Sequence, residues 1–212
     1  MLRHRRDRRC SANRRRTVPP SFPDWRNSRE AGPVVMLSTA RNSRANVMTM
    51  SWHMMVEFVP PLVACVVSDA NHGFAALRAT RECVIIALPP LELASKVVAV
   101  GNCSGCEVDK FAAFELTPLP AAHVAPPLVA ECFANLECRL RDSRLVSKYN
   151  LFVLEVLKAW RDPAQKNPKT IHHHGYGRLV VDGDTIELKS NKPYPPTRRR
   201  FTGTSATRPA PC

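Results

Sequence analysis

Two stretches of the chain carry small hydrogen-bonding side chains at a spacing that could hold a polar ligand. The first, Ala45 to Trp52, reads A-N-V-M-T-M-S-W and is strand-like. The second, Asn102 to Phe111, reads N-C-S-G-C-E-V-D-K-F, which predicts a glycine turn opening a short helix that bears Lys110. Each stretch therefore joins hydrogen-bonding groups to a regular element that would hold them in place.

The first stretch suits a flat heteroaromatic ring, which needs hydrogen-bonding partners along one edge and an apolar surface against its face. Asn46, Thr49 and Ser51 supply the polar groups, and Trp52 can supply the apolar surface. The alternative is that Thr49 and Ser51 only suit the polar side of a half-buried strand.

The second stretch suits a phosphate, which needs backbone N–H donors and positive charge. Ser104 and Gly105 lie in the turn, where backbone N–H groups are free to donate, and Lys110 could reach a phosphate. Alternatively, Lys110 is a solvated lysine on the surface of its helix.

The cysteines fall into two kinds. Cys103 and Cys106 form a C-x-x-C, which could hold a structural metal, cycle as a redox dithiol, or be two free thiols in a loop. A zinc site would need a second ligand pair, and only the His172–His174 run is available; that run lines a ligand entrance or forms a polar loop. Four other cysteines lie in apolar runs and are expected to be buried: Cys65, Cys83, Cys132 and Cys138.

The net charge of +13 belongs to the two ends of the chain. Residues 1–31 hold ten arginines against three acidic residues, and residues 189–212 hold six basic residues and no acid. Both ends lack apolar residues to bury, so disordered basic tails are predicted at 1–31 and 191–212. The interval 32–190 remains as one domain with a sizeable core. Nucleic-acid binding through the arginine-rich tails is an alternative, but it is not expected as the main role.

The interval between the tails has a β-rich pattern. The first three extended runs predict a meander, and Asp182-Gly183-Asp184 predicts the turn of a closing hairpin. Together, these runs and turns predict a mainly β fold with short helices. The predicted architecture is an antiparallel barrel rather than alternating βαβ units. Extended runs are expected at 33–39, 45–52, 62–68, 83–88, 131–141 and 149–160, and helices at 73–80 and 92–100.

Several signatures are absent from the sequence. It has no G-x-x-x-x-G-K-[ST], no G-x-G-x-x-G, no G-x-S-x-G and no H-E-x-x-H, which argues against a P-loop or Rossmann enzyme. No apolar run approaches the roughly 20 residues that span a bilayer. We therefore expect a cytoplasmic protein without a membrane partner.

The ordered set of motifs resembles the flavin reductase-like family of flavoredoxin type, whose fold is an FMN-binding split β-barrel. The resemblance runs from about Pro33 to Ser190. Its motifs are P-V-V-M-L-S-T, A-N-V-M-T-M-S-W, P-P-L-V-A-C-V-V-S, N-C-S-G-C-E-V-D-K-F, P-L-V-A-E-C, L-F-V-L-E-V and H-H-H-G-Y-G.

The resemblance implies a homodimer that holds FMN where two barrels meet and passes hydride from NADH or NADPH to flavin. Such chemistry needs no side chain as acid or base, since the protein orients the cofactor. The alternative is a non-enzymatic FMN-binding electron-transfer protein. A monooxygenase or another acceptor would take the electrons. The residues expected to contact FMN are Asn46, Met48, Thr49, Met50, Ser51, Trp52, Ser68, Asn71, His72, Cys103, Ser104 and Lys110.

The loop that follows residue 68 departs from the family pattern. Many members carry a basic residue near Asn71 and a hydroxyl near Gly73, and this chain has neither. A larger share of phosphate binding is therefore expected from Lys110.

Overall fold

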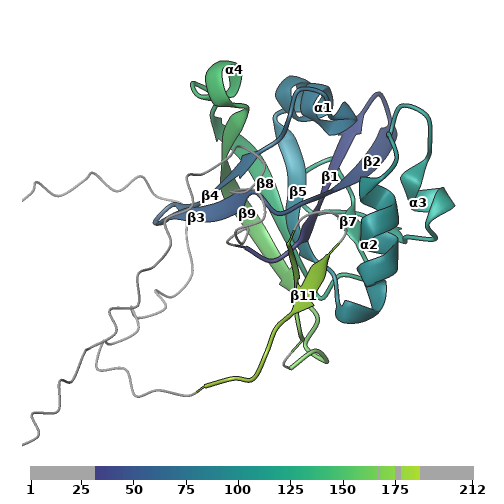
Figure 1. Ribbon diagram of the computed structural model, residues 1–212. Coiled ribbons are helices and arrows are strands. Elements are labelled where there is room, and N and C mark those ends of the chain that lie inside the picture. Colours follow the sequence, from purple (N-terminus) through teal and green to yellow (C-terminus); the bar gives the residue numbers. More distant parts are fainter. Residues whose placement is uncertain (1–31, 167, 175–177, 187–212) are drawn as a thin grey trace, which may run out of the picture. The chain divides into compact units, whose positions relative to one another are not determined.

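A seven-stranded antiparallel sheet forms the centre of the described chain (Figure 1). The computed structural model describes residues 32–166, 168–174 and 178–186, so the tails predicted at 1–31 and 191–212 lie outside them. The elements below belong to the unit that ends at Asp182. The strands of the sheet are β1 (Val35–Arg41), β2 (Arg44–Met50), β3 (His53–Phe58), β4 (Pro61–Val66), β5 (Glu82–Leu88), β8 (Ala134–Asp142) and β9 (Leu151–Arg161).

The order of strands across the sheet is β2-β1-β5-β8-β9-β4-β3. Two short antiparallel pairs lie apart from it, β6 (Pro118–Leu119) with β7 (Leu128–Val129) and β10 (Ile171–His173) with β11 (Leu179–Val181). The helices are α1 (His72–Thr80), α2 (Ala94–Gly101), α3 (Lys110–Ala113) and α4 (Val146–Tyr149), and a 3-10 turn, η2 (Leu91–Leu93), precedes α2.

Side chains alternate between two cores on the two faces of the sheet. Val35 and Leu37 of β1 face the first core, which also receives residues from β2, β4, β5, β8, β9 and α1. Val34 and Met36 face the second core, where α2 and α3 cover β2. Because so many strands contribute to the first core, the sheet curls around it. Among the described strands β2 and β3 are the two ends, and no ladder joins them, so the barrel is open.

The first two extended runs of the predicted meander do pair, as the β1–β2 hairpin. Its turn has two residues between the paired positions. Arg41 pairs with Arg44, and both intervening residues, Asn42 and Ser43, have positive φ, at 51° and 62°. Positive φ at both central positions is the turn whose twist matches that of the flanking strands. The hairpin therefore fixes the register of β2 and the positions of its side chains.

The predicted meander is wrong. The run at 62–68 does form a strand, β4, but β4 pairs with β3 and β9 and not with β2. The intervening strand β3 was not predicted, because its apolar residues Met54, Met55 and Val56 follow one another without alternation. All three are exposed, so β3 has no buried face from which a period of two could arise.

The helices that approach the sheet are positioned by local signals. The helices predicted at 73–80 and 92–100 are confirmed as α1 and as η2 followed by α2. Asp109 caps α3, since its Oδ1 accepts hydrogen bonds from the backbone N–H groups of Phe111 and Ala112 at 3.1 and 3.3 Å. No helix in the described part of the chain is both long and apolar enough to cross a membrane.

The closing hairpin differs from the one predicted. β11 pairs with β10, the strand that precedes it, in the register Ile171 to Val181 and His173 to Leu179. Asp182 to Ile186 adopt no strand, and the rest of the expected second arm lies outside the described residues. A backbone hydrogen bond of 2.7 Å from Val34 N to Ile171 O ties this hairpin to the start of β1.

Candidate functional site

A cavity of about 440 Å³ opens where β2 ends beside α2. β2 is an end strand of the sheet, so residues that point to opposite faces can both reach its edge. Seven predicted ligand contacts line this larger cavity: Met48, Thr49, Met50, Ser51, Trp52, Ser68 and Asn71. The structure thus brings these seven residues together around one cavity.

A smaller cavity of about 180 Å³ adjoins the first, with Met48, Asn71, Gly101 and Asn102 in both linings. The remaining five predicted contacts line this smaller cavity: Asn46, His72, Cys103, Ser104 and Lys110. All twelve residues singled out in the sequence therefore meet at two joined cavities.

Thr49 holds one wall of the larger cavity in place. Its hydroxyl donates a hydrogen bond of 2.7 Å to the carbonyl of Val97, which joins β2 to α2. The hydroxyl proton is thus used within the protein, while the lone pairs of Thr49 Oγ1 can still accept from a ligand. The structure supports a positioning role for Thr49 in addition to the predicted contact.

Asn46 presents a buried acceptor at the smaller cavity. The residue is 6% exposed, and Oδ1 has no hydrogen-bond partner in the described part of the protein. A Cβ added at Gly105 would overlap Oδ1, so only glycine lets the 102–106 loop pack this closely. An unpaired buried acceptor costs about 1–3 kcal/mol, and a donor supplied by a ligand would offset that cost.

Lys110 is buried rather than solvated, so the alternative of a surface lysine is wrong. It is 4% exposed, and Nζ donates a hydrogen bond of 2.8 Å to the carbonyl of Val100 in the last turn of α2. Burial lowers the pKa of Lys110, and the nearby Cys103 acts in the opposite direction. Nζ keeps further N–H groups for a ligand in the smaller cavity.

The first turn of α1 forms another side of the smaller cavity. Asn71 occupies the N-cap position with extended backbone angles, yet its side chain makes no capping hydrogen bond. Ala70, His72 and Gly73 also line the cavity. The first N–H groups of a helix have no acceptor within it, so α1 directs donors and the positive end of its dipole at this cavity.

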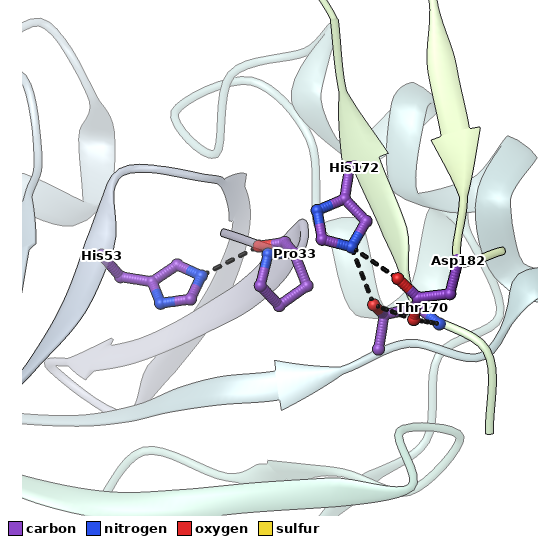
Figure 2. Close-up of polar contacts among 5 residues, drawn as sticks. All are labelled: Pro33, His53, Thr170, His172 and Asp182. Atoms are coloured by element: carbon purple, nitrogen blue, oxygen red, sulfur yellow. Dashed lines mark hydrogen bonds and ion pairs between the residues drawn. The ribbon is translucent and has the colours of Figure 1, made fainter. Parts of the chain in front are cut away.

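The histidine run divides between the two sides of β10, as Figure 2 shows for its first member. His172 Nε2 contacts Asp182 Oδ1 at 2.9 Å and Thr170 Oγ1 at 3.1 Å, while Thr170 Oγ1 donates to Asp182 Oδ2 at 2.6 Å. This hydrogen bond from Thr170 is the main cause that lowers the pKa of Asp182. His173 points the other way and lines the larger cavity together with its partner Leu179.

A second histidine contact in Figure 2 fixes the start of β3. His53 Nε2 lies 2.8 Å from the carbonyl of Pro33, and so β3 is tied to the segment before β1. This contact braces the chain on either side of the larger cavity, which Val34 and Trp52 line.

Sequence reasoning missed several lining residues. Asn102 stands within a motif that was singled out, and the period of two in a strand could have separated His173 from His172. The other missed residues are mostly apolar and carried no chemical signal: Val34, Val66, Val97, Val98, Gly101 and Leu179.

The fold is that of a known class of proteins. The chain belongs to the family described as flavin reductase like domain, whose family model matches residues 27–179. An uncharacterized protein of Archaeoglobus fulgidus is 30% identical over 153 residues, which cover 72% of this chain and 86% of that protein.

Two solved structures share the architecture. One is an FMN-binding domain of a flavin reductases-like enzyme from Shewanella baltica, with a TM-score of 0.69 at 24% identity over 74% of this chain and 90% of that one. The other is the NADH:FAD oxidoreductase SgcE6 of Streptomyces globisporus, with a TM-score of 0.67 at 20% identity over 79% and 96%. The predicted fold, mainly β with short helices and of the FMN-binding split-barrel type, is confirmed.

Proposed function

We propose that the protein binds FMN across the two joined cavities and passes hydride from NADH or NADPH to flavin. The observation that carries the proposal is the buried Oδ1 of Asn46, which has no partner among the described residues and faces the loop of the smaller cavity. The ribityl chain of FMN carries hydroxyl donors that such an acceptor would bind. The residues present therefore fit the cofactor.

The division of the site follows the chemistry of its walls. In the larger cavity, Thr49 and Ser51 offer polar groups beside Met50 and Val97, which suits the edge and face of a flavin ring. In the smaller cavity, Lys110 and the first turn of α1 suit the phosphate. A phosphate there would also favour the charged form of Lys110, which burial disfavours.

The protein's own part in the reaction is to bind and orient. Bound FMN supplies the hydride acceptor, and no side chain needs to act as acid or base. Met48 to Trp52 would fix the plane of the ring, and His173 with Leu179 would narrow the opening of the larger cavity. Holding the two reactants in line would raise the rate by removing the entropic cost of bringing them together. NADH as donor is favoured by the likeness to the NADH:FAD oxidoreductase of Streptomyces globisporus.

A homodimer is part of the proposal, with a second copy of the chain covering β3. The side chains of Met54, Met55 and Phe58 are 57%, 61% and 79% exposed, and they continue from Trp52 at the edge of the larger cavity. Exposed apolar residues on both sides of an end strand mark an interaction surface. A partner there would complete the wall of the larger cavity and enclose the ring.

The dimer is tested by Met55→Glu combined with Phe58→Glu, which puts two charges on this surface. We expect the variant to sediment as a monomer and to lose FMN affinity, whereas Leu145→Glu, a change at an exposed apolar residue away from both cavities, leaves the dimer intact. A dimer that survives the double change would place the interface elsewhere.

The hydride transfer is tested by absorbance spectroscopy of the purified protein. We expect a flavin spectrum after reconstitution with FMN, and bleaching under anaerobic conditions when NADH or NADPH is added. Flavin that stays oxidised with both nucleotides but accepts electrons from dithionite would favour an electron-transfer protein. A colourless protein after reconstitution would rule out both functions.

The same proposal includes a cytoplasmic location, where both nucleotides are available. It also includes an electron acceptor, which is a monooxygenase or another oxidant.

A further inference from the structure

The six cysteines in the described part of the chain differ sharply in accessibility. Cys106 is exposed and Cys103 is half-buried. By contrast, burial raises the pKa of the Cys65 thiol to about 12 and raises that of Cys83 well above its ordinary value, which makes these thiols inert. The remaining two, Cys132 and Cys138, are also buried and have raised pKa values.

The exposed thiol of Cys106 has a basic partner. His72 Nδ1 lies 3.0 Å from Cys106 Sγ, although the two residues are 34 positions apart in the sequence. The glycine between the cysteines makes this possible, since a Cβ at Gly105 would lie 3.0 Å from His72 Cδ2 and would overlap Asn46. The fold thus builds the pairing of an accessible thiol with an imidazole, the arrangement that activates nucleophilic cysteines.

The second thiol of the C-x-x-C lies beside a cation. Cys103 Sγ and Lys110 Nζ both contact the carbonyl of Val100, at 3.8 and 2.8 Å. Lys110 therefore places a positive charge close to the sulfur that attacks in the second step of a disulfide exchange. Cys103 also lines the smaller cavity, whereas Cys106 is open to solvent at the surface.

We propose that Cys103 and Cys106 form a second redox site, a dithiol that reduces low-molecular-weight disulfides by thiol–disulfide exchange. His72 Nδ1 takes the proton of Cys106, whose sulfur attacks one sulfur of the substrate; a mixed disulfide forms and the other half leaves as a thiolate. That thiolate takes the proton from His72. Cys103 then attacks Cys106 Sγ, and the second half leaves as a thiol with the proton of Cys103. Two electrons pass from the dithiol to the substrate, and a Cys103–Cys106 disulfide remains.

The dithiol shares His72, Cys103 and Lys110 with the smaller cavity, so it is tested without FMN or nucleotide, and the result does not depend on the proposed flavin function. The full chain carries Cys10→Ser and Cys212→Ser, because those two cysteines lie outside the described residues and could also react. The reduced protein is mixed with glutathione disulfide, and intact mass with peptide mapping follows the products. We expect a Cys103–Cys106 disulfide and release of both glutathione halves as thiols.

Single variants separate the steps. Cys103→Ser should stop at glutathione bound to Cys106, and Cys106→Ser should react about tenfold more slowly than the parent. His72→Gln should slow the attack by Cys106 roughly fivefold. The proposal is overturned if Cys106→Ser reacts as fast as the parent, or if glutathione stays on Cys106 while Cys103 is intact.

Discussion

The two cavities differ in how the chain builds their walls. One wall of the larger cavity comes from consecutive residues, Met48 to Trp52, at the end of β2, and α2 and the β10–β11 hairpin supply others. The wall of the smaller cavity comes from the N-terminus of α1, the 102–105 loop and the first residue of α3. The first wall holds its shape through a strand register, whereas the second depends on several elements meeting correctly.

The two cavities also differ in the free-energy cost of their polar groups when no ligand is bound. At the larger cavity, the hydroxyl proton of Thr49 already has an acceptor within the protein, so this donor is satisfied without a ligand. The smaller cavity holds a buried lysine and the unpartnered acceptor of Asn46, both of which cost free energy until a ligand binds. Binding energy should therefore be concentrated at the smaller cavity, and specificity for the ring at the larger one.

The largest effect is expected from Gly105→Ala. The added methyl group would overlap Asn46 Oδ1 and press on His72, which should shift the loop and close the smaller cavity. We expect FMN affinity, measured by fluorescence titration, to fall at least ~100-fold, about 2.7 kcal/mol. The matched control is Gly183→Ala, where nothing lies within 4 Å of the added atom. Unchanged FMN affinity in Gly105→Ala would place the cofactor outside the smaller cavity.

The next largest effect is expected from Lys110→Met, which should distinguish binding of the phosphate from binding of the ring. Lys110→Met keeps a long buried side chain but removes the charge and the hydrogen bond to Val100. FMN affinity should fall roughly 10–100-fold, because a hydrogen bond to a charged group contributes about 1.5–3 kcal/mol. Riboflavin, which lacks the phosphate, should bind nearly as well as before.

The control for this prediction is Lys96→Met, which removes a partly exposed lysine paired with Glu115 at 3.5 Å. Equal losses for FMN and riboflavin in Lys110→Met would show that Lys110 acts only by holding the end of α2.

A smaller effect is expected at the larger cavity. Thr49→Val removes the hydrogen bond to Val97 and leaves that carbonyl without its donor. The free energy of unfolding should fall by about 1 kcal/mol, and the affinities for FMN and riboflavin should fall together by several-fold. Thr80→Val is the control, since Thr80 Oγ1 donates to Ala76 O at 3.0 Å away from both cavities. A loss confined to FMN would contradict the assignment of the ring to this cavity.

The smallest effect concerns the hairpin that carries His173. The hydrogen bond from Thr170 is the main cause of the lowered pKa of Asp182, so the folded protein binds a proton there less readily than the unfolded chain. The resulting stability is present above the ordinary pKa of the carboxyl group and is lost as pH falls through the lower folded value. Urea unfolding at successive pH values below about 5 should show a steeper loss for the parent than for Asp182→Asn. Parallel curves would mean that this contact does not stabilise the hairpin.

The fold was predictable where burial produces a pattern. The hairpin of β1 and β2, the helix α1 and the strands β5, β8 and β9 all have a buried side, and their apolar residues recur with the period of the element. β3 was missed because it has no buried side. The closing hairpin was assigned wrongly because its local pattern does not show that β11 pairs with the segment before it, β10, and not with the segment after it. Pairing partners are decided by contacts between distant segments, which no local pattern records.

The sequence by itself determined the family, the polar strand end at Met48 to Trp52 and the candidate residues of the N-C-S-G-C segment. Only the tertiary structure decided that Lys110 is buried, that Asn46 Oδ1 has no partner among the described residues, and that His72 meets Cys106. The reason is physical. Residue types and spacing fix what a local segment can offer, whereas burial, pKa and the partner of each polar group depend on segments that fold against it from elsewhere in the chain.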